Sequence, residues 1–121
     1  MANKTVAPSA AYKALEAIAE RLSASEARRP GAFQFQMTGA EAEDFAIEVD
    51  DARKVKPKPG RSDRMPRNLV TGDGKQLRMI LEGKRDARVA FLAGAVQFRG
   101  DVRYLERVLD ALEMMKRNSS K

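Results

Sequence analysis

The sequence predicts an α+β fold in which helices pack on one face of a mainly antiparallel sheet of about five strands. Three observations point to it: helical periodicity near both ends, a two-residue alternation between them, and glycine or proline at the junctions. The predicted order is helix, several strands, two short helices, one strand and a long helix. A chain of 121 residues fits one domain over 1–121, with a folded part at 10–116 and frayed ends at 1–8 and 118–121.

The N-terminal part predicts an amphipathic helix over residues 9–22. Ser9 is a suitable N-cap, and apolar side chains recur after it at helical spacing. The apolar stripe consists of Ala11, Leu15, Ile18 and Leu22. Pro30 and Gly31 break the pattern, so the helix is expected to end before them.

Two segments alternate apolar and polar side chains, which predicts half-buried strands over 33–38 and 45–50. The apolar members are Phe33, Phe35, Met37, Phe45, Ile47 and Val49. Because the connection between them is short and polar, we expect an antiparallel pair with both apolar rows on one side of the sheet.

The segment that follows, 51–65, contains prolines and a glycine that exclude a strand at the centre of a sheet. Val55 indicates an edge strand before these prolines, and a loop is expected after it. Leu69 and Val70 then indicate a further short strand within 66–71.

In the C-terminal half, three aspartates are placed to cap three helices, and glycines follow the first two. The predictions are Asp73 before a helix over 74–82, Asp86 before 87–93 and Asp101 before 102–117. A short strand with Val96 and Phe98 on one face precedes the last helix. The apolar stripe of that helix consists of Val102, Leu105, Val108, Leu109, Leu112 and Met115.

The composition narrows the possible chemistry. The chain has neither cysteine nor histidine, which removes disulfides, the usual zinc ligands and the commonest general base. Carboxylate or lysine chemistry is formally open, but we expect a protein that is not an enzyme and has no cofactor. The first residues lack a long apolar core and no run reaches the roughly 18 apolar residues of a membrane span, so a cytoplasmic protein is expected.

The positive charge is local. Residues 53–67 hold seven basic side chains and one acidic one, an excess equal to the +6 formal charge of the whole chain. A solvated loop is the simplest interpretation. Transient docking on an anionic membrane surface is a second one, through Lys54, Lys56, Lys58, Arg61 and Arg64. Contact with nucleic acid is disfavoured because no aromatic side chain lies among these charges.

The segment 77–112 combines three spaced glycines with a short helix around Phe91 and a strand that ends at Gly100. It resembles the C-terminal signature of the sterol carrier protein type-2 family, the nonspecific lipid-transfer domains. The matching residues are Leu77, Leu81, Gly83, Ala90, Phe91, Gly94, Val96, Phe98, Gly100, Asp101 and Leu105. The chain departs from the family at Pro66, Arg67 and Asn68, where an acidic residue usually begins a strand, and in its basic loop over 53–65.

The resemblance implies an apolar cavity between the sheet and the helices, closed in part by the long C-terminal helix. Such a cavity accommodates fatty acyl, sterol-like or isoprenoid molecules, and the protein would bind and transfer these lipids. Its lining would consist of Phe33, Phe35, Phe45, Ile47, Leu77, Ile80, Phe91, Phe98, Leu105, Leu109, Leu112 and Met115.

Two alternatives stay open. The same apolar side chains are equally explained as plain core. The fold would then serve a non-catalytic accessory module with a filled core, acting through a protein partner.

Overall fold

The computed structural model describes the backbone of residues 9–119 and the side chains of residues 9–110. The helices are α1 (Ala10–Ser23), the short 3-10 helix η1 (Gly39–Glu41), α2 (Gly74–Leu81), α3 (Ala87–Leu92) and α4 (Val102–Ser119). The strands are β1 (Gly31–Thr38), β2 (Asp44–Val49), β3 (Val55–Pro59), β4 (Pro66–Asp73) and β5 (Val96–Gly100). The predicted order of elements is confirmed. Fraying was predicted at 1–8 and 118–121. Residues 1–8, 120 and 121 lie outside the described residues, and α4 runs to Ser119, two residues beyond its predicted end.

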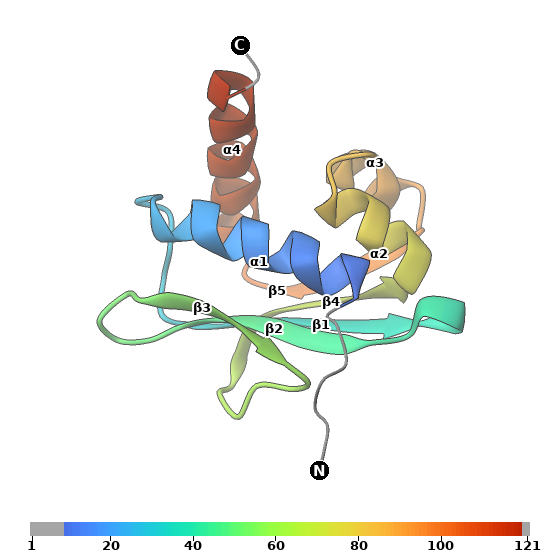
Figure 1. The fold of residues 1–121 in the computed structure, drawn as a ribbon, viewed down its shortest axis with the longest axis horizontal. Coiled ribbons are helices and arrows are strands. Elements are labelled where there is room, and N and C mark those ends of the chain that lie inside the picture. The colour runs from blue at the N-terminus through green and yellow to red at the C-terminus, as the bar shows by residue number, and fades with distance from the viewer. Residues whose placement is uncertain (1–8, 120–121) are drawn as a thin grey trace.

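The five strands form one sheet in the order β3-β2-β1-β4-β5, with the helices on one side of it (Figure 1). Neighbouring strands are antiparallel except β1 and β4, which run parallel. The prediction of an α+β fold with a mainly antiparallel sheet is therefore confirmed. The prediction of an antiparallel β1–β2 pair with both apolar rows facing the helices is also confirmed.

The parallel pair arises from the segment between β3 and β4, which crosses the face of the sheet that carries no helix. Gln34 fixes this crossing segment from a buried position on that face. Its Nε2 donates to the carbonyl of Gly60 at 3.3 Å, and its Oε1 accepts from the amide of Ser62 at 2.8 Å. The Ser62 hydroxyl donates to Glu48 at 2.5 Å. The crossing segment is thus held against the sheet.

Helix α1 covers the half of the sheet formed by β1, β2 and β3. The Ser9 hydroxyl accepts from the amide of Tyr12 at 3.0 Å, so the predicted N-cap is confirmed. The Tyr12 ring packs edge-on against Phe45 at 5.9 Å between centroids. The face of α1 buried on the sheet consists of Ala11, Leu15, Ala19 and Leu22.

The remaining three helices begin at the predicted aspartates. Asp73 accepts a hydrogen bond from the amide of Gln76, and Asp86 accepts from the amides of Arg88 and Val89. Asp101 Oδ1 accepts from the amide of Tyr104 at 3.0 Å. These bonds satisfy backbone donors that each first turn leaves unpaired, which explains why the boundaries follow the sequence so closely. None of the described helices is long and apolar enough to cross a membrane.

Helix α4 rises steeply from the sheet (Figure 1), so that its early turns contact the core through Tyr104 and Val108. The Tyr104 hydroxyl accepts from the amide of Arg29 at 3.1 Å. The prediction that Val102 belongs to the buried stripe is wrong, because its side chain is 59% exposed. The side chains of Leu112 and Met115 lie outside the described residues.

Candidate functional site

The side chains predicted to line a ligand cavity divide into three groups in the structure. The first group is fully packed in the core, mostly beneath α1. It consists of Phe35, Phe45, Ile47 and Leu77, none more than 7% exposed. Phe35 and Phe45 contact each other with centroids 5.5 Å apart. These residues build the scaffold on which the site rests.

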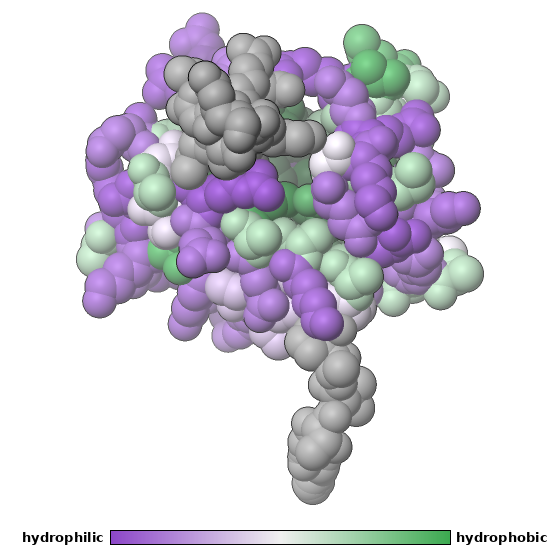
Figure 2. Space-filling model, turned by 45° about the horizontal axis from the view of Figure 1, so that its top comes forward, coloured by the Kyte–Doolittle hydropathy of each residue, from purple (hydrophilic) through white to green (hydrophobic). Residues whose placement is uncertain are grey.

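The second group is half-buried on the helix-covered side of the sheet. It consists of Phe33, Ile80, Phe98, Leu105 and Leu109. Phe33 and Phe98 come from strands on either side of β4, and their ring centroids lie 6.5 Å apart. Figure 2 looks onto this side of the molecule and shows apolar atoms at the bottom of a recess. This apolar recess is the candidate ligand site.

Helix α4 borders the recess with Leu105 and Leu109. Helical geometry places these two side chains between the buried face, which carries Tyr104, and the side that carries Glu106 and Asp110. Arg88 of α3 reaches that side, because its Nη2 lies 3.0 Å from Glu106 Oε1 and 2.7 Å from Asp110 Oδ1. Hydrogen bonding to Glu106 raises the pKa of Arg88 above its ordinary value. The charged Arg88 thus links α3 to α4.

The third group is a single exposed residue, Phe91 on α3. Its side chain is 47% exposed, whereas the neighbouring Ala90 is fully buried and attaches the helix to the core. Phe91 therefore does not belong to the buried core, in contrast to its predicted place in the cavity lining.

A small cavity lies where the end of α1 meets the start of α4. Its volume is about 10 Å³, and its lining includes Leu22, Phe33, Ile47 and Tyr104. That is room for about one water molecule, against roughly 300–1,000 Å³ for typical ligand pockets. A wider recess of about 300 Å³ lies at the surface between α1 and η1, and the ion pair between Arg78 and Glu41 makes it polar. Neither space matches the lipid-sized cavity that the resemblance implies.

One polar side chain interrupts the apolar side of the sheet. Asn68 is 1% exposed and pairs in register with Phe33 and Gly100. Its Nδ2 donates to the carbonyl of Asp101 at 2.9 Å, while its Oδ1 has no hydrogen-bond partner among the described residues. The sequence analysis noted Asn68 as a departure from the family but did not predict that its side chain is buried.

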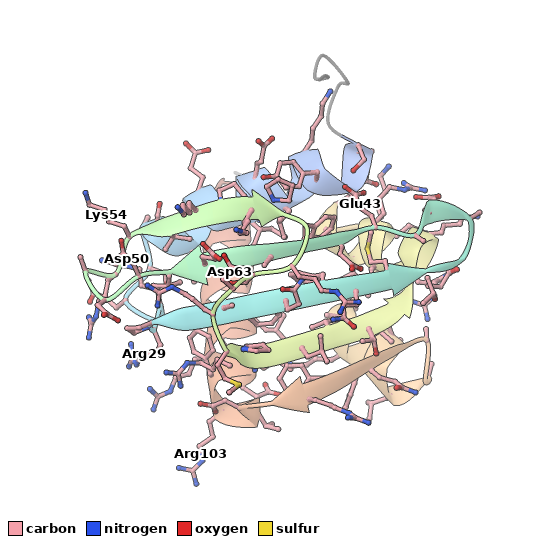
Figure 3. The ribbon with its side chains drawn as sticks, turned by 90° about the horizontal axis from the view of Figure 1, so that it is seen from below. Arg29, Glu43, Asp50, Lys54, Asp63 and Arg103 are labelled. Atoms are coloured by element: carbon pink, nitrogen blue, oxygen red, sulfur yellow. The ribbon has the colours of Figure 1, made fainter. Side chains whose placement is uncertain are left out.

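The basic side chains predicted to contact a membrane lie in and around β3. Figure 3 shows the helix-free side of the sheet, with Lys54 at its edge. Lys56 and Lys58 lie on this side, because they pair in register with Glu48 and Ala46. Lys54 is in the β2–β3 turn, and Lys56 and Lys58 belong to the edge strand β3. Arg61 and Arg64 are in the crossing segment. Acidic residues stand among them: Arg61 lies 3.1 Å from Asp44, and Lys58 lies 4.0 Å from Asp63. The basic segment is therefore partly neutralised and faces away from the recess.

The described residues contain no cluster of acidic side chains that could hold a metal ion.

No family model matches the sequence, and no curated protein matches it. Several solved structures have the same fold. Sterol carrier protein domain 2 of Helicoverpa armigera matches with a TM-score of 0.66 at 15% identity, over 96% of this chain and 94% of that chain. Palmitated SCP2L2 from Aedes aegypti matches with a TM-score of 0.62 at 19% identity, over 80% of this chain and 88% of that chain.

A third match is part of a much larger protein. The stereoselective inverting sec-alkylsulfatase Pisa1 from Pseudomonas sp. matches with a TM-score of 0.60 at 16% identity, over 83% of this chain and 15% of that chain. Many of the structures that resemble this one are sterol carrier protein 2 domains. The chain therefore has the sterol carrier protein 2 fold.

Proposed function

We propose that this protein binds a lipid or a similar apolar molecule in the recess between β5, α3 and α4. The observation that carries the proposal is the pair Phe33 and Phe98, which form an apolar floor that the helices leave partly uncovered. Palmitate is bound in the similar Aedes aegypti structure. The proposed ligand contacts are the half-buried Phe33, Ile80, Phe98, Leu105 and Leu109, together with Leu112 and Met115 further along α4.

The chemistry of such a site requires little directed bonding. Each methylene that leaves water contributes roughly 0.8 kcal/mol, so a long acyl chain binds through contact area with aromatic and aliphatic side chains. Asn68 adds one buried acceptor on the same side of the sheet. We expect fatty acyl, sterol-like and isoprenoid molecules to compete for the same recess.

A whole lipid requires the recess to widen, because neither cavity among the described residues is both apolar and lipid-sized. We propose that α4 moves away from α3 to widen it. Two ion pairs of Arg88 oppose this movement. Exposed ion pairs contribute at most about 1 kcal/mol each, whereas burying about ten methylenes yields roughly 8 kcal/mol. Ligand binding therefore outweighs the cost of separating these side chains.

The test is displacement of a fluorescent fatty acid by palmitate, with native mass spectrometry of the purified protein. Leu105→Trp should fill the recess and weaken binding by roughly tenfold or more. Arg107→Trp on the same helix is the control, because Arg107 is exposed on another side of α4. Failure of the natural sequence to bind palmitate, a sterol or an isoprenoid would contradict the proposal.

A second candidate is a non-catalytic accessory module with a filled core. The small cavity favours it, as does the match to a minor part of a sulfatase chain. Stoichiometric recovery of one partner protein, together with no uptake of lipid, would support this function over the first.

Three expectations from the sequence remain predictions: the cytoplasmic location, the absence of catalysis, and membrane contact through Lys54, Lys56, Lys58, Arg61 and Arg64. Lys56 and Lys58 lie on the helix-free side of the sheet, so membrane contact there would be separate from lipid exchange through the recess.

A further inference from the structure

Helix α3 exposes its large apolar side chains to solvent, whereas most surface helices bury theirs. Its inward residue is the small Ala90, while its large side chains face solvent. Val89 is 58% exposed and Leu92 is 84% exposed, and Phe91 stands beside them. Of the five exposed large apolar side chains in the described part of the chain, three belong to this six-residue helix.

These side chains form a protruding apolar corner. Figure 1 places α3 at the edge of the helix layer, away from α1, and Figure 2 shows a green apolar group at the same corner. An exposed leucine and phenylalanine on one short helix contribute little to the core of the folded chain. A contiguous exposed apolar group of this kind marks a contact with a partner or a membrane.

Cationic side chains lie beside the N-terminal end of α3. Lys84 and Arg85 occupy the turn before α3, and Arg88 follows within its first turn. Two acids lie among them: Glu82 pairs with Lys84 at 3.3 Å, and Asp86 caps the helix through hydrogen bonds to the amides of Arg88 and Val89. Residues 82–88 thus hold three basic and two acidic side chains. Apolar side chains at a tip with basic residues beside them complement a surface whose interior is apolar and whose boundary is negative, which is an anionic lipid bilayer.

We propose that α3 docks this protein on an anionic lipid surface, with Val89, Phe91 and Leu92 among the acyl chains and Lys84 and Arg85 beside the phosphates. Docking there turns the rim of the recess toward the membrane, since Arg88 links α3 to α4. Lipid phosphates also compete with Glu106 and Asp110 for the Arg88 guanidinium. The inference goes beyond ligand binding, because docking requires no bound ligand.

The first test is co-sedimentation with vesicles of equal parts phosphatidylcholine and phosphatidylglycerol, compared with vesicles of phosphatidylcholine alone. Leu92→Asp should lower the apparent affinity for anionic vesicles by roughly tenfold or more. Met65→Asp is the matched control, because Met65 is 87% exposed and lies in the crossing segment on the helix-free side. Both variants change the net charge equally. A difference between their affinities for anionic vesicles is therefore due to the position of the substitution.

The second test uses the absence of cysteine from the chain, which makes an introduced thiol unique. A polarity-sensitive fluorophore attached in Leu92→Cys should shift to the blue on anionic vesicles, and the same label in Met65→Cys should not. A blue shift at position 65 instead, or loss of binding on neutralising Lys54, Lys56 and Lys58, would assign docking to the helix-free face and overturn the inference.

Two further results would also overturn it: no binding of the natural sequence to anionic vesicles, or equal binding of Leu92→Asp and Met65→Asp. Palmitate binding in solution is measured separately. If palmitate binds while vesicles do not, docking through α3 fails and the proposed function stands. If the protein binds vesicles through α3 but does not bind palmitate, docking through α3 stands and the proposed function fails.

Discussion

Arg88 of α3 lies 2.7 Å from Asp110 of α4, and this contact joins two helices that border the apolar recess. A second bond to Glu106 at 3.0 Å strengthens the link. All three side chains are partly exposed to water, so the link is weak enough to open.

Replacing Arg88 by glutamine removes the charge that holds the two helices together. We expect Arg88→Gln to speed both entry and release of palmitate several-fold and to lower the free energy of unfolding by less than about 1 kcal/mol. Stopped-flow fluorescence with a labelled fatty acid measures both rates. Lys84→Gln is the control, because its ion pair with Glu82 at 3.3 Å does not reach α4. Equal rates in the two variants would contradict a gating role.

The caps of the C-terminal helices could be predicted because they depend on neighbours in the chain. Asp73, Asp86 and Asp101 each bond an amide two or three residues ahead, and that geometry follows from sequence spacing alone. The alternation that predicted β1 and β2 is local in the same way.

Strand β4 was harder to predict, since its helix-facing residues are Asn68, Val70 and Gly72 rather than an apolar row. Sequence reasoning therefore found a short strand where the structure has one of eight residues at an interior position. Its parallel pairing depends on Gln34, which holds the crossing segment through contacts distant in sequence.

The sequence predicted which apolar side chains face the helices, but not how far each of them is buried. Alternation placed Phe33 and Phe35 on the same side of the sheet, yet α1 covers one of them and leaves the other half-buried. Which side chain is covered depends on where each helix crosses the sheet. The buried Tyr104 was missed, although it lies one helical turn before Val108 and on the same face of α4, so the i, i+4 spacing could have found it.

Tyr104 provides a test of how α4 is anchored. Tyr104→Phe removes the hydroxyl that accepts from the Arg29 amide, and leaves that partly buried donor without its bond. We expect a loss of about 1–3 kcal/mol in the free energy of unfolding, measured by urea denaturation. Tyr12→Phe is the control, and it should change stability by less than about 0.5 kcal/mol because the ring contact with Phe45 is retained. A loss no larger than that of the control would show that the hydroxyl does not anchor the helix.

Asp101 gives the fold a defined dependence on pH. Hydrogen bonding from the amide of Tyr104, followed by that from Arg67, lowers the pKa of Asp101 below its ordinary 3.8. Because the pKa is lowered on folding, the stabilisation is present above 3.8 and is lost as the pH falls from there through the folded value.

Asp101→Asn keeps an oxygen that can cap α4 and removes the charge. The natural sequence should therefore be more stable than Asp101→Asn at neutral pH, and the difference should disappear at pH values below the folded pKa of Asp101. Urea denaturation of both proteins across this range measures it. A difference that does not change with pH would show that the cap, and not the charge, stabilises the helix.

Substitutions of Asn68 test how its buried amide affects stability. Asn68→Asp replaces the donor to the Asp101 carbonyl by an oxygen and buries a carboxylate, so we expect at least about 3 kcal/mol of destabilisation at neutral pH. Burial raises the pKa of such a carboxyl, and this variant should therefore regain stability relative to the natural sequence as the pH falls. Asn68→Leu removes the unpaired Oδ1 together with the bond to Asp101, so it should lie within about 1 kcal/mol of the natural sequence. Urea denaturation distinguishes the two, and equal losses would mean that Asn68 acts through its shape rather than its hydrogen bonds.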